Sequence, residues 1–272
     1  MEGMITVRYA EDTQPKGRHF HDCYQLLYVV RGKARITVSG IEYEAGTGSL
    51  VLIGRFESHA ICIESETYHR YTIMLPPEIH TCHPILGDRL LSLLVNRPAG
   101  FCHCADLSGY PQAEQLLRQM VAESEVPAPM RERMQILLLA QLLILFCRQQ
   151  PEALQHDPAN LKRIQQVRQY LEENYASVCI LEELADRFHL SQSYLSHLFK
   201  DITGVSVISY LTAYRLAKAK HLLVETDMEI GKVSAACGFS DHSNFGRTFR
   251  SETGMTPTVF RKTYTVDLER KR

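Results

Sequence analysis

The chain has 272 residues, which is enough for two domains of ordinary size. Its formal net charge is only −1, so charge alone does not identify a nucleic-acid partner. The strongest apolar run, Ile136–Phe146, is too short to span a membrane, and the first residues lack the features of a secretion signal. We therefore expect a cytoplasmic protein whose 8 cysteines are free thiols.

Residues 1–75 alternate between apolar and polar side chains, as half-buried strands do. Turns that contain glycine separate the apolar runs. Strands are predicted over Tyr24–Val30, Ala34–Val38, Ile41–Glu44, Ser49–Ile53, His59–Ile63 and Tyr68–Leu75. Short strands at this spacing favour a small antiparallel barrel or sandwich.

A cluster of histidines lies in this first segment. The residues and their order are His19-x-His21-x-x-x-Gln25 followed by Gly32, and then Gly48, Gly54 and His59. This order resembles the two cupin motifs, with Gln25 where metal-binding cupins usually have Glu and Gly54 where Pro is common. The resemblance implies a β-barrel into which the three histidines and Gln25 point.

Two interpretations of this cluster are open. Three imidazoles and an amide could bind a metal ion, or they could line a polar pocket for an uncharged ligand. Because Gln25 removes the one anionic ligand, we expect an effector-binding site at His19, His21, Gln25 and His59, in a pocket that is functional or vestigial. The prediction therefore assigns no metal and no other cofactor.

Two further cysteine and histidine groups raise the question of zinc. Cys82-His83 and Cys102-His103-Cys104 lack the CxxC spacing of structural zinc sites. On a strand over Phe101–Leu107, alternation would send Cys102 and Cys104 to one face and His103 to the other. We expect small buried thiols here instead of a metal site.

Two helices are predicted next, over Tyr110–Ser124 and Met130–Gln149. The second carries more apolar side chains than one stripe can hold, so it must be covered on more than one side. The covering partner is either the domain's own core or a second copy of the chain. On the second interpretation, one of Leu138, Leu142 and Leu145 projects between two subunits of a homodimer.

The segment 150–159 contains two prolines and is typical of a linker. It separates an effector-binding and dimerisation domain, 1–150, from a DNA-binding domain, 161–265, with 151–160 as the linker and Asn160 as the cap of the next helix. Residues 1–160 carry 14 Lys and Arg against 18 Asp and Glu, whereas 161–272 carry 16 against 13. The second domain is therefore mildly basic.

The last hundred residues contain one pattern twice. Each copy, 181–200 and 230–250, reads as a short helix, a tight turn, a serine that can cap, and a second helix. Four pairs of residues recur at an offset of 50: Phe199 and Phe249, Thr203 and Thr253, Gly204 and Gly254, Tyr210 and Phe260. An internal repeat of this kind predicts two helix-turn-helix units. Turn residue His189 stands where the second copy has Gly238, a position that favours glycine.

The second helix of each copy has an apolar stripe and a polar face. In 191–202 the stripe is Leu195, Leu198, Phe199 and Ile202. An ordinary helical bundle with a solvated polar face would show the same pattern once, but two copies in register favour a reader of the DNA major groove. The predicted DNA-binding residues are Gln192, Ser193, Ser196, His197, Lys200, Arg215, Lys218, His242, Ser243, Asn244, Arg247 and Arg250.

One helix over Val207–Glu225 is predicted to join the two copies, with Arg215 and Lys218 on its outer face. Such a helix would hold two recognition helices at a fixed separation. Successive major grooves on one face of a duplex lie about 34 Å apart, so one chain could contact two of them.

The second domain resembles the AraC/XylS family of bacterial transcription regulators. The residues that carry the resemblance are Leu184-Ala185, Ser191-x-x-Tyr194-Leu195-Ser196-x-x-Phe199-Lys200, Thr203-Gly204, Arg215-Leu216-x-x-Ala219-x-x-Leu222-Leu223, Gly238-Phe239-Ser240, Phe245, Phe249, Gly254-x-Thr256-Pro257 and Phe260-Arg261. The resemblance implies a seven-helix domain that binds promoter DNA, a homodimer, and RNA polymerase as a partner. Arg250 departs from the Lys that is common in the family.

The sequence thus predicts an α+β protein of two domains, a cupin-like antiparallel β-barrel with helices followed by an all-α double helix-turn-helix domain. The predicted function is a transcription regulator, expected to be an activator, that responds to a small-molecule effector. Two alternatives stay open: a ligand-independent repressor, and a cupin metalloenzyme fused to a DNA-binding domain. A DNA-repair enzyme would need a nucleophilic cysteine in a defined motif, and none is recognisable.

Overall fold

The computed structural model describes residues 5–11, 16–77, 79, 90, 93–94, 101–125, 128–150, 158–177 and 181–269. The chain divides into two compact units, one of Met1–Leu161 with Asp201–Gly204 and one of Lys162–Lys200 with Val205–Arg272. In the described ranges, no helix is long and apolar enough to cross a membrane.

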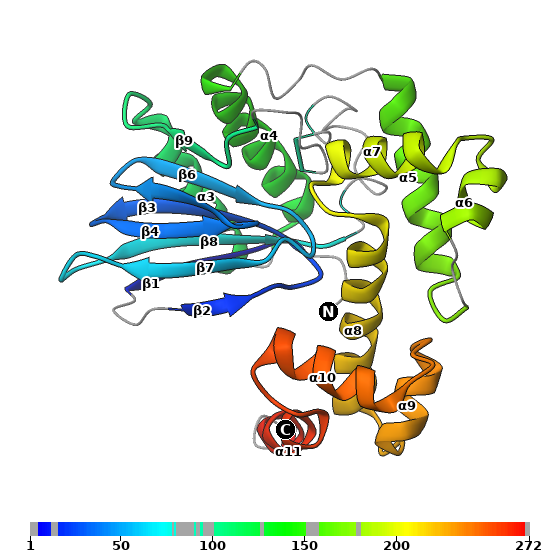
Figure 1. The fold of residues 1–272 in the computed structure, drawn as a ribbon. Helices are drawn as coiled ribbons and strands as arrows, with labels where there is room; N and C mark the ends of the chain where they lie inside the picture. Colours follow the sequence, from blue (N-terminus) through cyan, green and yellow to red (C-terminus); the bar gives the residue numbers. More distant parts are fainter. Residues whose placement is uncertain are drawn as a thin grey trace. The chain divides into compact units, whose positions relative to one another are not determined.

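The first unit is built on two antiparallel sheets (Figure 1). The larger sheet has the strand order β1 (Thr6–Glu11), β8 (His69–Leu75), β3 (Tyr24–Arg31), β6 (Ser49–Ile53) and β9 (Cys104–Asp106). The smaller sheet has the order β2 (Lys16–His19), β7 (His59–Ile63), β4 (Ala34–Val38) and β5 (Ile41–Ala45). The predicted α+β class is confirmed, and in the described residues the strands pair as two sheets.

The six strands predicted between residues 24 and 75 are confirmed, each within one residue at either end. β1 and β2 were not assigned individually, although they lie in the segment predicted to alternate. β9 covers only Cys104–Asp106, a shorter strand than the predicted Phe101–Leu107.

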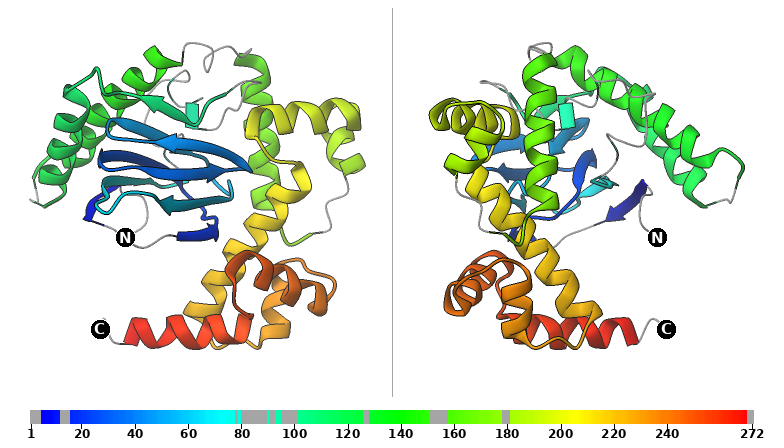
Figure 2. Two further views of the ribbon diagram at one scale, coloured as in Figure 1. Left: turned by 60° about the vertical axis from the view of Figure 1, so that its left-hand side comes forward. Right: turned by 90° about the vertical axis from the view of Figure 1, so that its right-hand side faces the viewer.

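The unit has three layers, because β3 is buried on both faces. Leu27 and Val29 face the smaller sheet and pack with side chains such as Ile36 of β4. The alternate residue Leu26 faces the other way, toward helices α3 (Gln112–Glu125) and α4 (Arg131–Gln149), where it shares a core with Leu139. Figure 2 shows these two helices on one face of the sheet. A strand covered on both faces reads as a continuous apolar run, which explains the sequence of β3.

The structure decides between the two coverings that the sequence left open for helix α4. One of Leu138, Leu142 and Leu145 would project between subunits if a second chain covered them, but all three are buried in the unit's own core, with 5%, 0% and 5% of their surface exposed. They pack with α3 and the larger sheet in one apolar cluster. The helix periodicity was right, and the dimer interpretation was wrong for these three leucines, because the domain's own core covers them.

The second unit is helical throughout its described residues. Its helices are α5 (Pro158–Glu173), α6 (Leu181–Arg187), α7 (Gln192–Thr203), α8 (Val207–Glu225), α9 (Ile230–Ala236), α10 (His242–Thr253) and α11 (Pro257–Glu269). Helix α5 begins within the predicted linker, so Asn160 lies in its first turn and not at its cap. A proline suits that first position because its missing N–H would have no helical partner.

Helix α8 has the bounds predicted from the sequence and joins the two halves of this unit (Figure 1). Its N-terminus is capped by Ser206, whose hydroxyl accepts a hydrogen bond from the backbone N–H of Ser209 at 3.1 Å. Leu216 and Leu223 are fully buried. At 1.5 Å per residue the helix is about 28 Å long. Helices α6 and α7 lie at one of its ends, and α9 and α10 lie at the other.

Candidate DNA-binding surface and histidine site

The two predicted helix-turn-helix units have the same local construction. In the first, the N–H of Leu190 donates to the carbonyl of Ala185 at 2.9 Å. In the second, the N–H of Phe239 donates to the carbonyl of Ser234 at 3.1 Å. Each bond closes the turn after the first helix, as in a Schellman motif. The turn needs one residue with a left-handed backbone, and this is His189 with φ 54° in one copy and Gly238 with φ 78° in the other.

The caps of the two recognition helices differ from each other. Ser191 caps α7, as predicted, by accepting a hydrogen bond from the N–H of Tyr194 at 3.2 Å. In the second copy the capping residue is Asp241, whose carboxylate accepts from the N–H of Ser243 at 2.8 Å. The expectation that Ser240 caps α10 was wrong. Ser240 lies 49 residues after Ser191, whereas Phe249 lies 50 after Phe199, so the second copy has one extra residue that moves the cap to Asp241.

Burial follows the repeat closely. Leu195 and Phe199 of α7 are fully buried, and so are Phe245 and Phe249 of α10, at the same positions of the helix. The aromatic packing also repeats. Phe199 contacts the ring of Tyr210 at a centroid distance of 5.6 Å, and Phe249 contacts the ring of Phe260 at 5.3 Å. One aromatic contact, at the same position in the two copies, therefore fixes each recognition helix on one face.

The opposite face of each recognition helix is solvent-exposed. The predicted DNA-binding residues that are exposed there are Gln192, Ser193, His197, Lys200, His242, Ser243, Asn244, Arg247 and Arg250, while Ser196 is half-buried. Sequence reasoning overlooked Tyr194, which is also exposed and stands at the position of Asn244 in the other copy. The offset of 50 residues was the signal that could have found it.

Arg215 does not lie free on the outer face of α8 as predicted. Its Nε donates to the carbonyl of Tyr175, and its Nη2 donates to the carbonyl of Ser177, both at 2.7 Å. These carbonyls follow the end of α5, where backbone acceptors lack helical partners. Arg215 therefore fixes the backbone that follows α5. Lys218 is half-buried, with its Nζ 5.1 Å from the ring centre of Tyr214.

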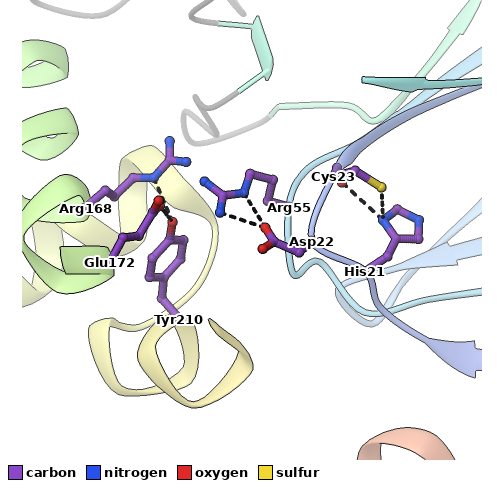
Figure 3. Close-up of polar contacts among 7 residues, drawn as sticks. All are labelled: His21, Asp22, Cys23, Arg55, Arg168, Glu172 and Tyr210. Carbon is purple, nitrogen blue, oxygen red and sulfur yellow. Dashed lines mark hydrogen bonds and ion pairs between the residues drawn. The ribbon is translucent and has the colours of Figure 1, made fainter. Parts of the chain in front are cut away.

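A buried polar group joins α5 to α8 in the same unit (Figure 3). The hydroxyl of Tyr210 donates to the carboxylate of Glu172 and accepts from Nε of Arg168 at 3.2 Å. Arg168 and Tyr210 are almost fully buried. Because hydrogen bonds to charged groups strengthen in a low-dielectric interior, this group holds the two helices in one arrangement.

The predicted effector residues come together in the first unit. His19 ends β2, His59 begins β7, and the two are paired residues across the smaller sheet. Their ring centres are 4.2 Å apart, and the ring of His21 is 4.9 Å from that of His59. His21 Nε2 is 2.9 Å from Oε1 of Gln25. His59 and Gln25 are buried, and the other two histidines are half-buried.

Burial keeps the inner imidazoles neutral. It lowers the pKa of His59 to about 3, and it also lowers the pKa of His21, which Gln25 and the Cys23 carbonyl partly offset. Cys23 lies beside His21, with Sγ 3.1 Å from Nδ1 (Figure 3), and burial raises the pKa of this thiol to about 12. The imidazole of His59 is thus uncharged, and burial disfavours the charged form of His21 beside an uncharged thiol.

An open pocket of about 480 Å³ lies elsewhere in the first unit and includes none of these histidines. It is lined by Tyr43, Glu44, Gly46, Thr47, Ser49, Cys102, Cys104, Asp106 and Ser108. The two cysteines share this pocket, while His103 is buried with its Nδ1 2.7 Å from the carbonyl of Leu52. Cys82 and His83 lie outside the described residues.

Two family profiles match the chain. The profile of the AraC-like ligand binding domain matches residues 2–183, and that of a helix-turn-helix domain matches residues 184–263. The first covers more than half of the chain.

Relatives with similar sequences are named as transcription regulators. RhaR of Escherichia coli K12, an HTH-type transcriptional activator, is 27% identical over 259 residues, which are 94% of this chain and 90% of RhaR. YijO of the same strain, an uncharacterized HTH-type transcriptional regulator, is 39% identical over 105 residues. That match covers 39% of this chain and 37% of YijO.

Among solved structures, ToxT from Vibrio cholerae is similar over almost the whole chain. The TM-score is 0.63 at 13% sequence identity, and the match covers 97% of this chain and 100% of ToxT. At this identity the likeness shows the fold, a sheet domain followed by a helical helix-turn-helix domain.

Proposed function

The chain belongs to the AraC family of transcription regulators, and from that premise we propose how its parts divide the work of binding DNA and responding to a ligand. The observation that carries the proposal is the repeat. Two recognition helices, α7 and α10, have the same buried and exposed positions 50 residues apart, and α8 joins them. A single chain can then contact two successive major grooves of a promoter.

The exposed residues of α10 suit base recognition. Arg247 can donate two hydrogen bonds to guanine, and Asn244 can pair with adenine. Lys200 and Arg250 occupy the same position in the last turns of α7 and α10, and both are exposed. We assign these two cations to the phosphate backbone, which positions a protein without reading sequence.

A duplex selected from a random-sequence library by the full chain serves as the specific DNA. Arg247→Ala should weaken binding to it by about 1–3 kcal/mol and should leave binding to scrambled DNA nearly unchanged. Lys200→Ala and Arg250→Ala should each weaken binding to both DNAs. Each should also reduce the slope of log binding constant against log salt concentration by about one unit. Equal losses on both DNAs for Arg247→Ala would show that this residue does not read bases.

We also propose that two chains pair through α4, on the face opposite to the buried leucines. Met134, Leu137 and Ile144 are large apolar side chains of α4 with 48%, 45% and 40% of their surface exposed. With exposed Gln141 they follow the alternating spacing of three and four residues that is typical of a two-helix seam. On this proposal the stripe takes the place of the one leucine, among Leu138, Leu142 and Leu145, that the sequence suggested for the seam.

Leu137→Asp should give a folded monomer in light scattering, because it places a charge in the seam and leaves the core intact. Gln115→Asp is a control for charge, since Gln115 is an exposed residue of α3 that lies outside the stripe. A monomeric wild-type chain at the concentrations used for DNA binding would refute the dimer.

We assign the ligand response to the first unit and place its binding site at His19, His21, Gln25 and His59. An activator of this design works in the cytoplasm and contacts RNA polymerase at the promoter. The regulator is not proposed to have a catalytic activity. A reporter gene under the selected DNA site would test the sign of regulation, and repression in place of activation would refute the activator role.

A further inference from the structure

Three histidines of the first unit converge from separate parts of the chain. His19 and His59 come from paired strands, and His21 from the segment that follows β2. One ligand atom from each of the three lies within 4.8 Å of the others. In the described residues, no other group of three or more potential metal-ligating His, Cys, Asp or Glu side chains is found.

The backbone fixes which ring nitrogen carries the proton. Nδ1 of His19 is 2.8 Å from the carbonyl of Gly17, and Nδ1 of His59 is 3.0 Å from the carbonyl of Glu57. A carbonyl oxygen can only accept, so Nδ1 is the donor in both rings. In a neutral imidazole Nε2 is then left with a lone pair, which is the form that binds metal ions.

His59 adds an independent observation. Its side chain is 1% exposed, and its Nε2 has no hydrogen-bond partner in the described structure. A buried polar atom without a partner is costly, and in native proteins such an atom calls for an explanation. A cation at the centre of the three rings would supply the missing partner.

His21 and Gln25 fit the same arrangement. Nδ1 of His21 is 3.1 Å from the carbonyl of Cys23, which again makes Nδ1 the donor and turns the Nε2 lone pair toward Oε1 of Gln25, 2.9 Å away. Two acceptors that face each other at this distance need a proton or a cation between them, or a rotation of the Gln25 amide that turns its N–H toward the ring. A proton on Nε2 satisfies the pair only if the Cys23 thiol supplies the hydrogen bond to Nδ1.

We propose that His19, His21 and His59 hold a divalent transition-metal cation, with the amide oxygen of Gln25 as a further ligand. Imidazole nitrogens suit zinc, nickel, copper and ferrous iron. The carbonyl that orients each ring through Nδ1 is the usual outer partner of a metal-binding histidine. Because metal–nitrogen bonds are about 2.0–2.1 Å long, ion binding requires the rings to rotate slightly inward.

This inference rests on the proposed function in one respect, since it names the class of ligand for the first unit. Metal binding would make the regulator respond to a divalent cation directly, or to a ligand held by that cation. Metal binding differs from the expectation from the sequence, which assigned no metal because Gln25 replaces the one anionic ligand. A neutral amide weakens a metal site, whereas three oriented imidazoles are sufficient to form one.

Cobalt(II) titration of the full chain, purified without a histidine tag, tests the proposal by the visible absorption of the bound ion. We expect saturation at about one cobalt per chain and displacement of cobalt by zinc. His59→Gln should weaken cobalt binding by about 100-fold or more. His69→Gln is the matched control, because His69 is a half-buried histidine of the same unit outside the cluster. Binding in this control should equal that of the wild type.

Gln25→Glu should tighten cobalt binding about tenfold, because it adds a negative charge to the ligand set. Misfolding cannot produce a gain in affinity, so this variant tests the site independently of His59→Gln. No saturable absorption in the wild type, or equal binding by the wild type and His59→Gln, would overturn the proposal. DNA titrations on the same samples are read separately. Absence of sequence-specific DNA binding would refute the proposed function and would leave the cobalt result to decide the metal site.

Discussion

Gly238 offers a sharp test of how the second helix-turn-helix unit is held together. A Cβ added there would lie 2.7 Å from the carbonyl oxygen of Ala176 and 2.9 Å from that of Tyr175, both of them backbone atoms. The residue also has φ 78°, in the left-handed region. Gly238→Ala therefore combines a conformational cost of about 1–2 kcal/mol with a collision of about 1–3 kcal/mol.

Gly254 provides the matched control. It has φ 74° and caps the end of α10, but a Cβ added there would meet nothing within 4 Å. Both alanine variants stiffen the unfolded chain, which offsets about 0.4–1 kcal/mol. Gly254→Ala should therefore cost about 1 kcal/mol, and Gly238→Ala about 2–4 kcal/mol.

Urea unfolding followed by far-UV circular dichroism measures both costs in the same helical unit, so that the difference between the variants isolates the collision. If Gly238→Ala were within about 0.5 kcal/mol of Gly254→Ala, the close approach of the two carbonyls would play no part in stability.

Three further predictions concern single side chains. Tyr210→Phe should destabilise the helical unit by about 1–3 kcal/mol in the same urea assay, because it removes two hydrogen bonds to charged groups; an unchanged midpoint would refute this. Leu142→Asp should leave little folded protein by gel filtration and circular dichroism, because it buries an unpaired charge in the core; a well-folded monomer would place this side chain at an interface. Iodoacetamide should modify exposed Cys62 much faster than half-buried Cys23, whose pKa burial raises to about 12; similar rates by mass spectrometry would contradict the raised pKa of Cys23.

Much of the fold was predictable because local patterns and the tertiary structure agree. The strands from Tyr24 to Leu75 alternate or are apolar throughout, and glycine turns separate them. The bounds of α8 followed from its helical periodicity of apolar and charged residues, and the structure adds Ser206 as its N-cap. The repeat at 50 residues gave the two recognition helices, since each copy confirms the pattern of the other.

Other features depended on contacts that a sequence does not show. The periodicity of α4 indicates two apolar faces, but only the position of the sheet decides which face is buried. Arg215 resembles any outward cation on α8 until the carbonyls of Tyr175 and Ser177 are placed beside it. The histidines could be brought together by resemblance, but their tautomers are set by carbonyl groups two residues away in the chain.

Strand β3 has a consequence for communication inside the first unit. Gln25 lies on the face of β3 that turns toward the smaller sheet, and its neighbour Leu26 lies on the opposite face, in the core shared with α4. A ligand that displaces the backbone at Gln25 would therefore also displace Leu26, whose side chain supports the helix with the exposed stripe. If binding and pairing of chains are coupled in this way, the coupling is reciprocal. Pairing would then change the affinity for the ligand by the same factor by which the ligand changes the affinity of one chain for another, so the sensitivity of the regulator would depend on its own concentration in the cell.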